Sequence, residues 1–333
     1  MAAPTYFLLL DSNIWIGERM LYSALGQALI HSLTRSGAVL AVPEVVKLEV
    51  CKVIHELADD AVIDTKKNIQ FLKQISQQQL SLLVPTDEKI REAIDERWRD
   101  LRGLIWPMPF TLDQSRAALS RIIDKTPPCG NNNEQFRDCC IWQCALDLTA
   151  VAPVYLISND YAFYDSGKRG TTIHPALRGE LAVLKGEVTI YPSLDDFLNR
   201  QTDATTKIDE GPLKDLIIAA VTPNAQQLAS GKSRRKSFIL GPVKACRITG
   251  YSTPKASEIA VAFSARFELI GNDTEAELSV SGSAAYHPAS NTISDIEVSE
   301  WSQHLKDLNS GVFSSSFSPT QFRDFTDGKF RVL

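Results

Sequence analysis

The sequence predicts an α/β domain built on a central parallel sheet, followed by a smaller α+β module with an antiparallel sheet. Short apolar runs alternate with helical segments over residues 1–199, which is typical of a parallel sheet flanked by helices. Residues 200–212 are polar and lack periodicity, as expected of a linker. Beyond them, over 213–333, apolar residues recur at every second position in several segments, which is typical of antiparallel strands.

The first predicted strand ends at a carboxylate. Four apolar residues, Phe7–Leu10, run directly into Asp11. A continuous apolar run this short is typical of a strand buried on both faces. Ligands of open α/β sheets bind at the carboxyl ends of the strands, so we expect Asp11 to lie at that edge. Asp11 is either a functional acid or only the N-cap of the next helix, because Asp is a good cap.

The elements after Asp11 alternate as a parallel sheet requires. A helix is predicted over 14–36, where apolar residues recur at helical spacing and Gly37 is a suitable stop. A second buried strand covers 38–42, and Pro43 is expected to open the next helix. Further helices are predicted over about 62–78, 86–101, 111–124, 134–150, 174–184 and 193–198, and further strands over 154–158 and 188–191.

The C-terminal module carries no motif of a catalytic kind. An amphipathic helix is predicted over 213–228, interrupted or kinked at Pro223. Four strands are predicted over 237–249, 258–270, 275–286 and 292–299. Dimerisation, substrate recruitment and signal sensing are the roles that we consider for this module.

The charge, the apolar runs and the cysteines limit the partners and the cellular environment that we expect for this protein. The formal net charge of −5 excludes a strongly basic nucleic-acid coat but allows a local basic groove. No apolar run approaches the roughly 18 residues that a membrane helix needs, and no basic segment precedes the first apolar run as in a secretory signal. The six cysteines have no zinc-site spacing, so we predict reduced thiols in a cytoplasmic protein.

Three more acidic residues occupy suggestive places. Glu49 lies about two turns into the helix after the second strand, Asp138 lies near the start of a later helix, and Asp160 follows the third strand. In a parallel sheet Asp11 and Asp160 share one edge, and the helix-borne acids can lean toward it. Carboxylates in contact repel one another, and a divalent cation such as Mg²⁺ or Mn²⁺ relieves the repulsion.

Each acid also has an ordinary structural interpretation. On that view Asp138 is a surface residue and Asp160 caps a short helix. The helix-borne acid stays ambiguous, because Glu44 in the first turn is a rival to Glu49. Asp147 is displaced by about 180° from Asp138 on the same helix, at roughly 100° per residue, so it should point away.

At these positions the chain resembles the PIN-domain ribonucleases, specifically the PIN-like branch found in many uncharacterised bacterial proteins. Leu10–Ile16 is similar to the family's opening Asp-x-Asn motif, and Val42–Val50 carries a glutamate, Glu49, six residues after its proline. Phe136–Trp142 is similar to the branch's Asp followed by Ile-Trp, and Leu156–Phe163 is similar to its Ser/Thr-x-Asp-x-x-Phe signature.

The resemblance covers residues 1–199 and implies a metal-dependent endoribonuclease with a three-layer PIN-like fold. In this family Asp11, Glu49, Asp138 and Asp160 would bind one or two Mg²⁺ or Mn²⁺ ions. A metal-activated water would then cleave single-stranded RNA and leave a 5′-phosphate and a 3′-hydroxyl. The family often implies a toxin or a defence effector. The alternative is a non-catalytic RNA-binding or assembly module that keeps only the fold.

The resemblance and the positions of neighbouring residues also predict supporting roles. Polar residues beside the acids are expected to orient the carboxylates or the phosphate: Asn13, Ser158 and Asn159. Basic residues close in sequence are expected to hold the RNA backbone: Lys52, Arg137, Lys168 and Arg169. RNA is the predicted partner, and the C-terminal module is expected to mediate a homo-oligomer or contact with a regulatory protein.

Overall fold

The computed structural model describes residues 3–76, 83–129, 135–165, 172–184, 186–200, 205–230, 238–270, 275–307 and 311–317. The chain divides into two compact units. The first comprises the chain up to Met20 together with Leu33–Ser193, and the second comprises Leu21–Ser32 and the chain from Leu194 onward. The short segment Leu21–Ser32, which belongs to the predicted first domain, is thus grouped with the second unit.

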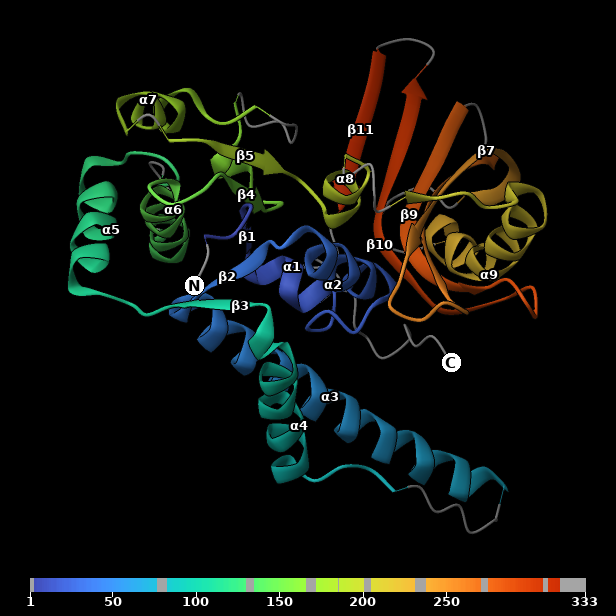
Figure 1. Ribbon diagram of the computed structural model, residues 1–333. Coiled ribbons are helices and arrows are strands. Elements are labelled where there is room, and N and C mark those ends of the chain that lie inside the picture. Colours follow the sequence, from blue (N-terminus) through green and yellow to red (C-terminus); the bar gives the residue numbers. More distant parts are fainter. Residues whose placement is uncertain are drawn as a thin grey trace. The chain divides into compact units, whose positions relative to one another are not determined.

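A five-stranded parallel sheet forms the centre of the first unit (Figure 1). Its order is β3-β2-β1-β4-β5, and its strands are β1 (Phe7–Leu10), β2 (Val39–Pro43), β3 (Ile105–Met108), β4 (Val154–Ile157) and β5 (Val188–Tyr191). All four residues of β1 are fully buried, as a central strand of a parallel sheet requires. The predicted α/β class with a parallel sheet and flanking helices is therefore confirmed.

The helix predicted over 14–36 is wrong, because the chain breaks it in the middle. The structure has two helices, α1 (Ser12–Gly17) and α2 (Ala24–Ser36). Between them Arg19, Met20 and Leu21 adopt positive φ angles of 48°, 55° and 64°. This left-handed backbone costs roughly 1–2 kcal/mol per residue. It is offset by burial of Met20 and Leu21 and by Arg97, whose Nε donates to the Met20 carbonyl at 2.8 Å.

The helix after β2 is longer than predicted. Pro43 ends the strand, and α3 runs without interruption from Glu44 to Ser76. It therefore merges the helix expected after Pro43 with the one expected over 62–78. The next helix, α4 (Asp87–Asp100), begins as predicted, with the Thr86 hydroxyl accepting a hydrogen bond from Lys89 N at 3.4 Å.

Strand β3 was missed by the sequence analysis. Its four residues include Pro107, which cannot donate a backbone hydrogen bond. The strand lies at the edge of the sheet, where proline is tolerated, and pairs only with β2 in the described sheet. A short run with a proline carries too weak a strand signal to be recognised by itself.

A partly buried ion pair connects three helices of the first unit: α5 (Leu112–Asp124), α6 (Phe136–Thr149) and α7 (Pro175–Leu184). The Arg121 guanidinium of α5 forms a bidentate ion pair with the Glu180 carboxylate of α7. The indole of Trp142, a fully buried residue of α6, donates to Glu180 Oε2 at 3.0 Å. This network fixes the helix that carries Asp138 against its neighbours.

The second unit contains an antiparallel sheet of order β11-β10-β9-β8-β7-β6. Its elements are α8 (Leu194–Leu198), β6 (Thr205–Thr206), α9 (Glu210–Ser230), β7 (Ile239–Ser252), β8 (Ile259–Ile270), β9 (Glu275–His287), β10 (Thr292–Asp307) and β11 (Gly311–Phe317). The sheet therefore has more strands than the predicted four. The predicted linker 200–212 contains β6 and the first turn of α9, which runs through Pro223 to Ser230.

One face of α9 provides the core of this unit. Five fully or almost fully buried residues stand four positions apart along the helix: Leu213, Ile217, Val221, Ala225 and Ala229. They pack with sheet residues such as Phe263 and Leu278. This spacing keeps one apolar stripe of the helix against the sheet. The predicted α+β module with an antiparallel sheet is therefore confirmed.

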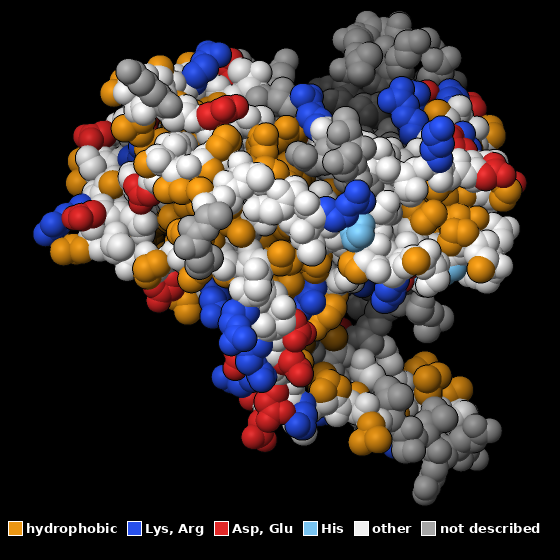
Figure 2. Space-filling model, viewed as in Figure 1, with side chains coloured by type: hydrophobic (Ala, Val, Ile, Leu, Met, Phe, Trp, Pro, Cys, Tyr) orange, Lys and Arg blue, Asp and Glu red, His pale blue; other side chains and the backbone are white. Residues whose placement is uncertain are grey.

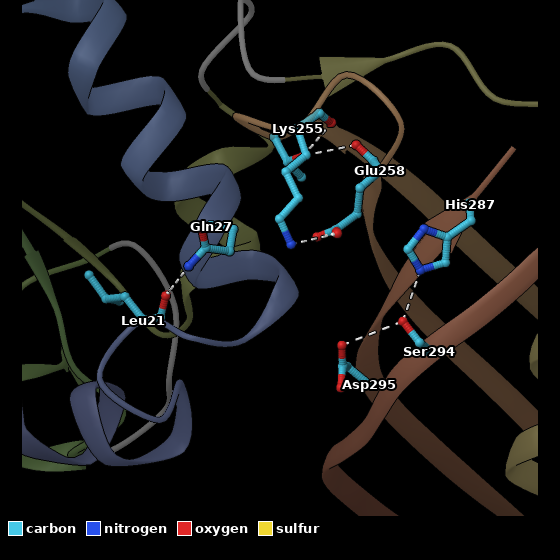
Figure 3. Close-up of polar contacts among 8 residues, drawn as sticks. Leu21, Gln27, Lys255, Glu258, His287, Ser294 and Asp295 are labelled. Carbon is cyan, nitrogen blue, oxygen red and sulfur yellow. Dashed lines mark hydrogen bonds and ion pairs between the residues drawn. The ribbon is translucent and has the colours of Figure 1, made fainter. Parts of the chain in front are cut away.

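Local polar contacts hold the turns of the antiparallel sheet (Figure 3). His287 on β9 and Ser294 on β10 are joined by a hydrogen bond of 3.0 Å, and Ser294 donates to Asp295 at 3.4 Å. Lys255 and Glu258 form an ion pair of 3.3 Å across the turn between β7 and β8. No helix among the described residues is long and apolar enough to cross a membrane.

The Arg121–Glu180 pair gives a prediction about stability. Glu180→Ala should lower the free energy of unfolding by about 2–3 kcal/mol, because it leaves the largely buried Arg121 unpaired. Urea denaturation measures the loss. The exposed Glu96→Ala on α4 is the control and should change stability by less than about 0.5 kcal/mol. Equal effects of the two substitutions would contradict this role of Glu180.

Candidate metal centre

The acid at the end of β1 does not act as a helix cap. Asp11 has an extended backbone at the N-cap position of α1, but its side chain makes no capping hydrogen bond. It is only 4% exposed, and its Oδ2 accepts a hydrogen bond from Ser158 Oγ at 2.7 Å. The side chain therefore does not serve the capping role, and the functional role of Asp11 stays a prediction.

Ser158 connects the ends of two neighbouring strands. Strands β1 and β4 pair in parallel, with Leu10 opposite Ile157, so the residues after them lie side by side. The fully buried Ser158 donates to Asp11, and its hydroxyl oxygen accepts from the backbone N–H of Asp160 at 3.1 Å. One hydroxyl thus orders both acid-bearing segments.

Asp160 has two roles in the structure. Its Oδ1 caps the short 3₁₀ helix η2 (Tyr161–Phe163) by accepting from Ala162 N at 2.8 Å. Its Oδ2 accepts from Gln135 Nε2, also at 2.8 Å. The capping interpretation is therefore correct, but it uses only one carboxylate oxygen.

Asp138 lies in the first turn of α6 and faces the other two acids. Burial and the negative charges of Asp11 and Asp160 raise its pKa from 3.8 to about 8, while the nearby Arg137 charge lowers it. The pKa of Asp11 is also raised, chiefly by burial, with Asp160 adding to the effect. Carboxylates from three separate segments therefore lie close enough at the carboxyl edge of the sheet for their charges to interact.

The structure distinguishes the two glutamates of α3. The Glu44 carboxylate accepts a hydrogen bond from Phe110 N at 2.8 Å, so it holds the segment that precedes α5. Glu49 instead forms an ion pair with Arg137, whose charge also acts on Asp11 and Asp138. Of the two glutamates, Glu49 is therefore the one linked to the acid cluster. The link is indirect, because the Glu49 carboxylate pairs with the Arg137 guanidinium.

A shallow pocket of about 360 Å³ lies beside this ion pair. It is lined by Val45, Leu48, Glu49, Lys52, Val53 and Arg137. Lys52 is exposed and forms a loose ion pair with Glu56 at 3.8 Å. The pocket therefore combines apolar walls with two cations next to the acids.

The remaining predicted site residues are placed as follows. Asn13, in the first turn of α1, is half-buried, and Asn159 lies between Ser158 and Asp160 at the end of β4. Lys168 and Arg169 lie outside the described residues. Gln135 was missed by the sequence analysis, although its hydrogen bond fixes Asp160. Its position three residues before Asp138, next to an Asn-rich loop, gave no signal that distinguished it from a loop residue.

A second group of possible metal ligands lies between α3 and α4. Ligand atoms of His55, Asp59 and Asp87 approach within 4.8 Å of one another. Both ring nitrogens of His55 already face carboxylates, with Nε2 at 2.6 Å from Asp87 and Nδ1 at 3.4 Å from Asp59. Asp87 also accepts from Arg91 Nε at 3.0 Å. These contacts join α3 to α4, and we call them the His55–Asp59–Asp87 clasp. They already occupy both ring nitrogens of His55 and both carboxylate oxygens of Asp87, so few lone pairs are left for a metal ion.

The acid cluster, in contrast, fits a hard divalent cation. Its donors are carboxylate oxygens from three elements, and their mutual repulsion is what a cation of charge +2 relieves. Asp11, Asp138 and Asp160 would hold such an ion, with Glu49 adjacent. The surrounding hydrogen bonds from Ser158 and Gln135 would keep the carboxylates oriented.

The raised pKa of Asp138 predicts how stability depends on pH without metal. Between about pH 4 and 8 the folded protein keeps a proton on Asp138 that the unfolded chain releases, so stability should fall as the pH rises. Asp138→Asn should weaken this dependence, to which Asp11 also contributes, and raise Tm at pH 9 by roughly 4–8 °C, equivalent to about 2 kcal/mol. Thermal denaturation in chelator measures it. Asp147→Asn on the same helix is the control, and an equal gain there would contradict the assignment.

Comparisons with known proteins agree with this geometry in the first unit. Residues 8–163 match the model of a family described as PIN domain. Comparison with curated proteins gave no match, and comparison with solved structures gave none either. The matched region runs from β1 through Phe163 and includes all four predicted acids. The N-terminal unit of this chain therefore contains a PIN domain, which is a nuclease-like fold.

Proposed function

We propose that the protein is a metal-dependent endoribonuclease whose active site is the acid cluster of the PIN domain. The observation that carries the proposal is that Asp11, Asp138 and Asp160 gather at one edge of the sheet, where burial, together with the charges of the other two acids, raises the pKa of Asp138 to about 8. A fold alone does not require three acids at one sheet edge, since their negative charges oppose one another. The crowding is explained if the site holds Mg²⁺ or Mn²⁺.

A bound cation of this kind would polarise a phosphodiester and activate a water for its hydrolysis, which leaves a 5′-phosphate and a 3′-hydroxyl. The chain's own residues orient the reacting groups. Ser158 fixes Asp11, Gln135 fixes Asp160, and Asn13 stands beside Asp11. Arg137 supplies a positive charge that draws the substrate phosphate toward the acids.

Single-stranded RNA is the substrate that suits the surroundings of the cluster. The acids repel a polyanion, so cations must bring it in. Arg137 and Lys52 border the pocket next to Glu49, and the apolar walls of that pocket offer a base a surface to contact. A flexible single strand can bring one base to such a pocket more readily than a duplex can.

We further propose that the enzyme works in the cytoplasm, where thiols stay reduced. All six cysteines are free, and four of them are buried in the first unit. A toxin or defence role is the cellular context that the family resemblance suggests. The rival function is a non-catalytic RNA-binding or assembly module that keeps the PIN fold.

Cleavage of a labelled single-stranded RNA in Mg²⁺ or Mn²⁺ distinguishes the enzyme from its rival. The double substitution Asp138→Asn, Asp160→Asn should reduce the rate more than about 100-fold, because loss of even an outer partner of a metal site costs about 10–100-fold. Asp147→Asn is the matched control on α6. Its carboxylate receives hydrogen bonds from Gln114 and Gln143, and its activity should match wild type. Equal rates in all three proteins would sink the proposal.

Titration with Mn²⁺ tests which glutamate of α3 supports the site. Glu49→Gln should weaken Mn²⁺ binding by about 10-fold, because it removes a negative charge beside the cluster. Glu44→Gln should bind as wild type does, since Glu44 serves Phe110 N and an amide oxygen still accepts that bond. A larger loss from Glu44→Gln than from Glu49→Gln would reverse the assignment.

A further inference from the structure

The second half of α3 extends beyond the helix that supports its first half (Figure 1). The first residue of α4, Asp87, contacts His55, which marks where α4 begins to cover α3. Residues 57–76 therefore continue past this point. At 1.5 Å per residue this segment is about 30 Å long. We call it the α3 extension.

The α3 extension exposes large apolar side chains. Exposed fractions are 41% for Leu57, 62% for Phe71, 51% for Leu72 and 71% for Ile75. Figure 2 shows hydrophobic atoms gathered toward the end of this helix. Exposed apolar side chains that gather in this way are typical of an interaction surface.

The positions on this face follow the spacing of a coiled coil. Steps of four and three residues alternate along it, which is the a and d pattern of a heptad repeat. The six positions are Leu57, Ala61, Asp64, Asn68, Phe71 and Ile75. We call these six positions the α3 seam. A helix with such a seam pairs with a second helix whose a and d residues are complementary in each layer of the coiled coil.

The seam is complementary to itself in the antiparallel direction. When two copies are aligned about a two-fold axis near residue 66, Leu57 meets Ile75 and Ala61 meets Phe71. The first layer is aliphatic, and the second places a small residue against a large one. In the central layers Asp64 meets Asn68, so the amide of one copy can donate to the carboxylate of the other. A parallel pair would instead place Asp64 against Asp64.

The charges of the α3 extension favour the same direction. Its first half is acidic and its second half is basic. The acidic residues, with Glu56 just before them, are Asp59, Asp60 and Asp64, and the basic residues are Lys66, Lys67 and Lys73. Antiparallel pairing puts the acidic half of one copy beside the basic half of the other, whereas parallel pairing opposes like charges.

We propose that the α3 extension is a dimerisation element, covered by the same segment of a second copy in an antiparallel coiled coil. This contact is isologous, so it closes after two copies. It lies in the first unit and differs from the C-terminal module that the sequence analysis favoured for oligomerisation. It does not depend on nuclease activity.

Sedimentation equilibrium tests the dimer. The full chain should sediment as a dimer, and Phe71→Asp, Ile75→Asp should convert it to a monomer with an unchanged circular dichroism spectrum, because both side chains are exposed. The control is Ile123→Asp on α5, which changes another exposed isoleucine and should leave the dimer intact. A monomeric wild-type chain at all concentrations, or a double variant that stays dimeric, would overturn the proposal.

Cysteine cross-linking tests the direction of pairing. A mixture of Leu57→Cys and Ile75→Cys chains should form a disulfide-linked dimer on mild oxidation, because these positions meet in the antiparallel register. Neither variant should cross-link alone, because identical positions would then lie about 27 Å apart along the helix axis. Wild type, with its own free cysteines, is the background control. Cross-linking of either variant alone would rule out the antiparallel arrangement.

Discussion

The removal of neighbouring carboxylates from water is the constraint on which the first unit depends. Asp11 and Asp138 are both harder to ionise than ordinary aspartates, and each feels the charge of Asp160. Such an arrangement opposes folding at neutral pH unless it is compensated. The chain supplies partial compensation through the Ser158 hydroxyl and the Arg137 charge. A divalent cation would complete it, and this is the physical reason for which we propose a metal site at these acids.

The topology explains why these acids meet. Strands β1 and β4 are neighbours although they are far apart in sequence, so Asp11 and Asp160 emerge at the same edge. Helix α6 brings Asp138 to that edge and is itself held by the Trp142–Glu180 hydrogen bond. The acid cluster is thus assembled by ordinary sheet pairing and by one partly buried ion-pair network behind it.

Much of this was predictable from the sequence, for identifiable reasons. The continuous apolar runs at Phe7–Leu10 and Val154–Ile157 predicted buried parallel strands, and the polar residues after them marked the edge. The break in the helix predicted over 14–36 was not predictable, because no glycine marks Arg19–Leu21 and a tertiary contact from Arg97 holds that turn. Strand β3 could not be recognised from the sequence, because Pro107 weakens the strand signal of its four residues. The contribution of Gln135 depends on a contact made only in three dimensions.

The location of a bound metal ion tests the central claim most directly. Crystals of the full chain soaked in Mn²⁺ and measured at the manganese absorption edge would reveal the ion through its anomalous scattering. Our account predicts a peak within coordination distance of carboxylate oxygens from Asp11, Asp138 and Asp160. A peak only at the His55–Asp59–Asp87 clasp, or ordered acid side chains with no ion between them, would contradict it.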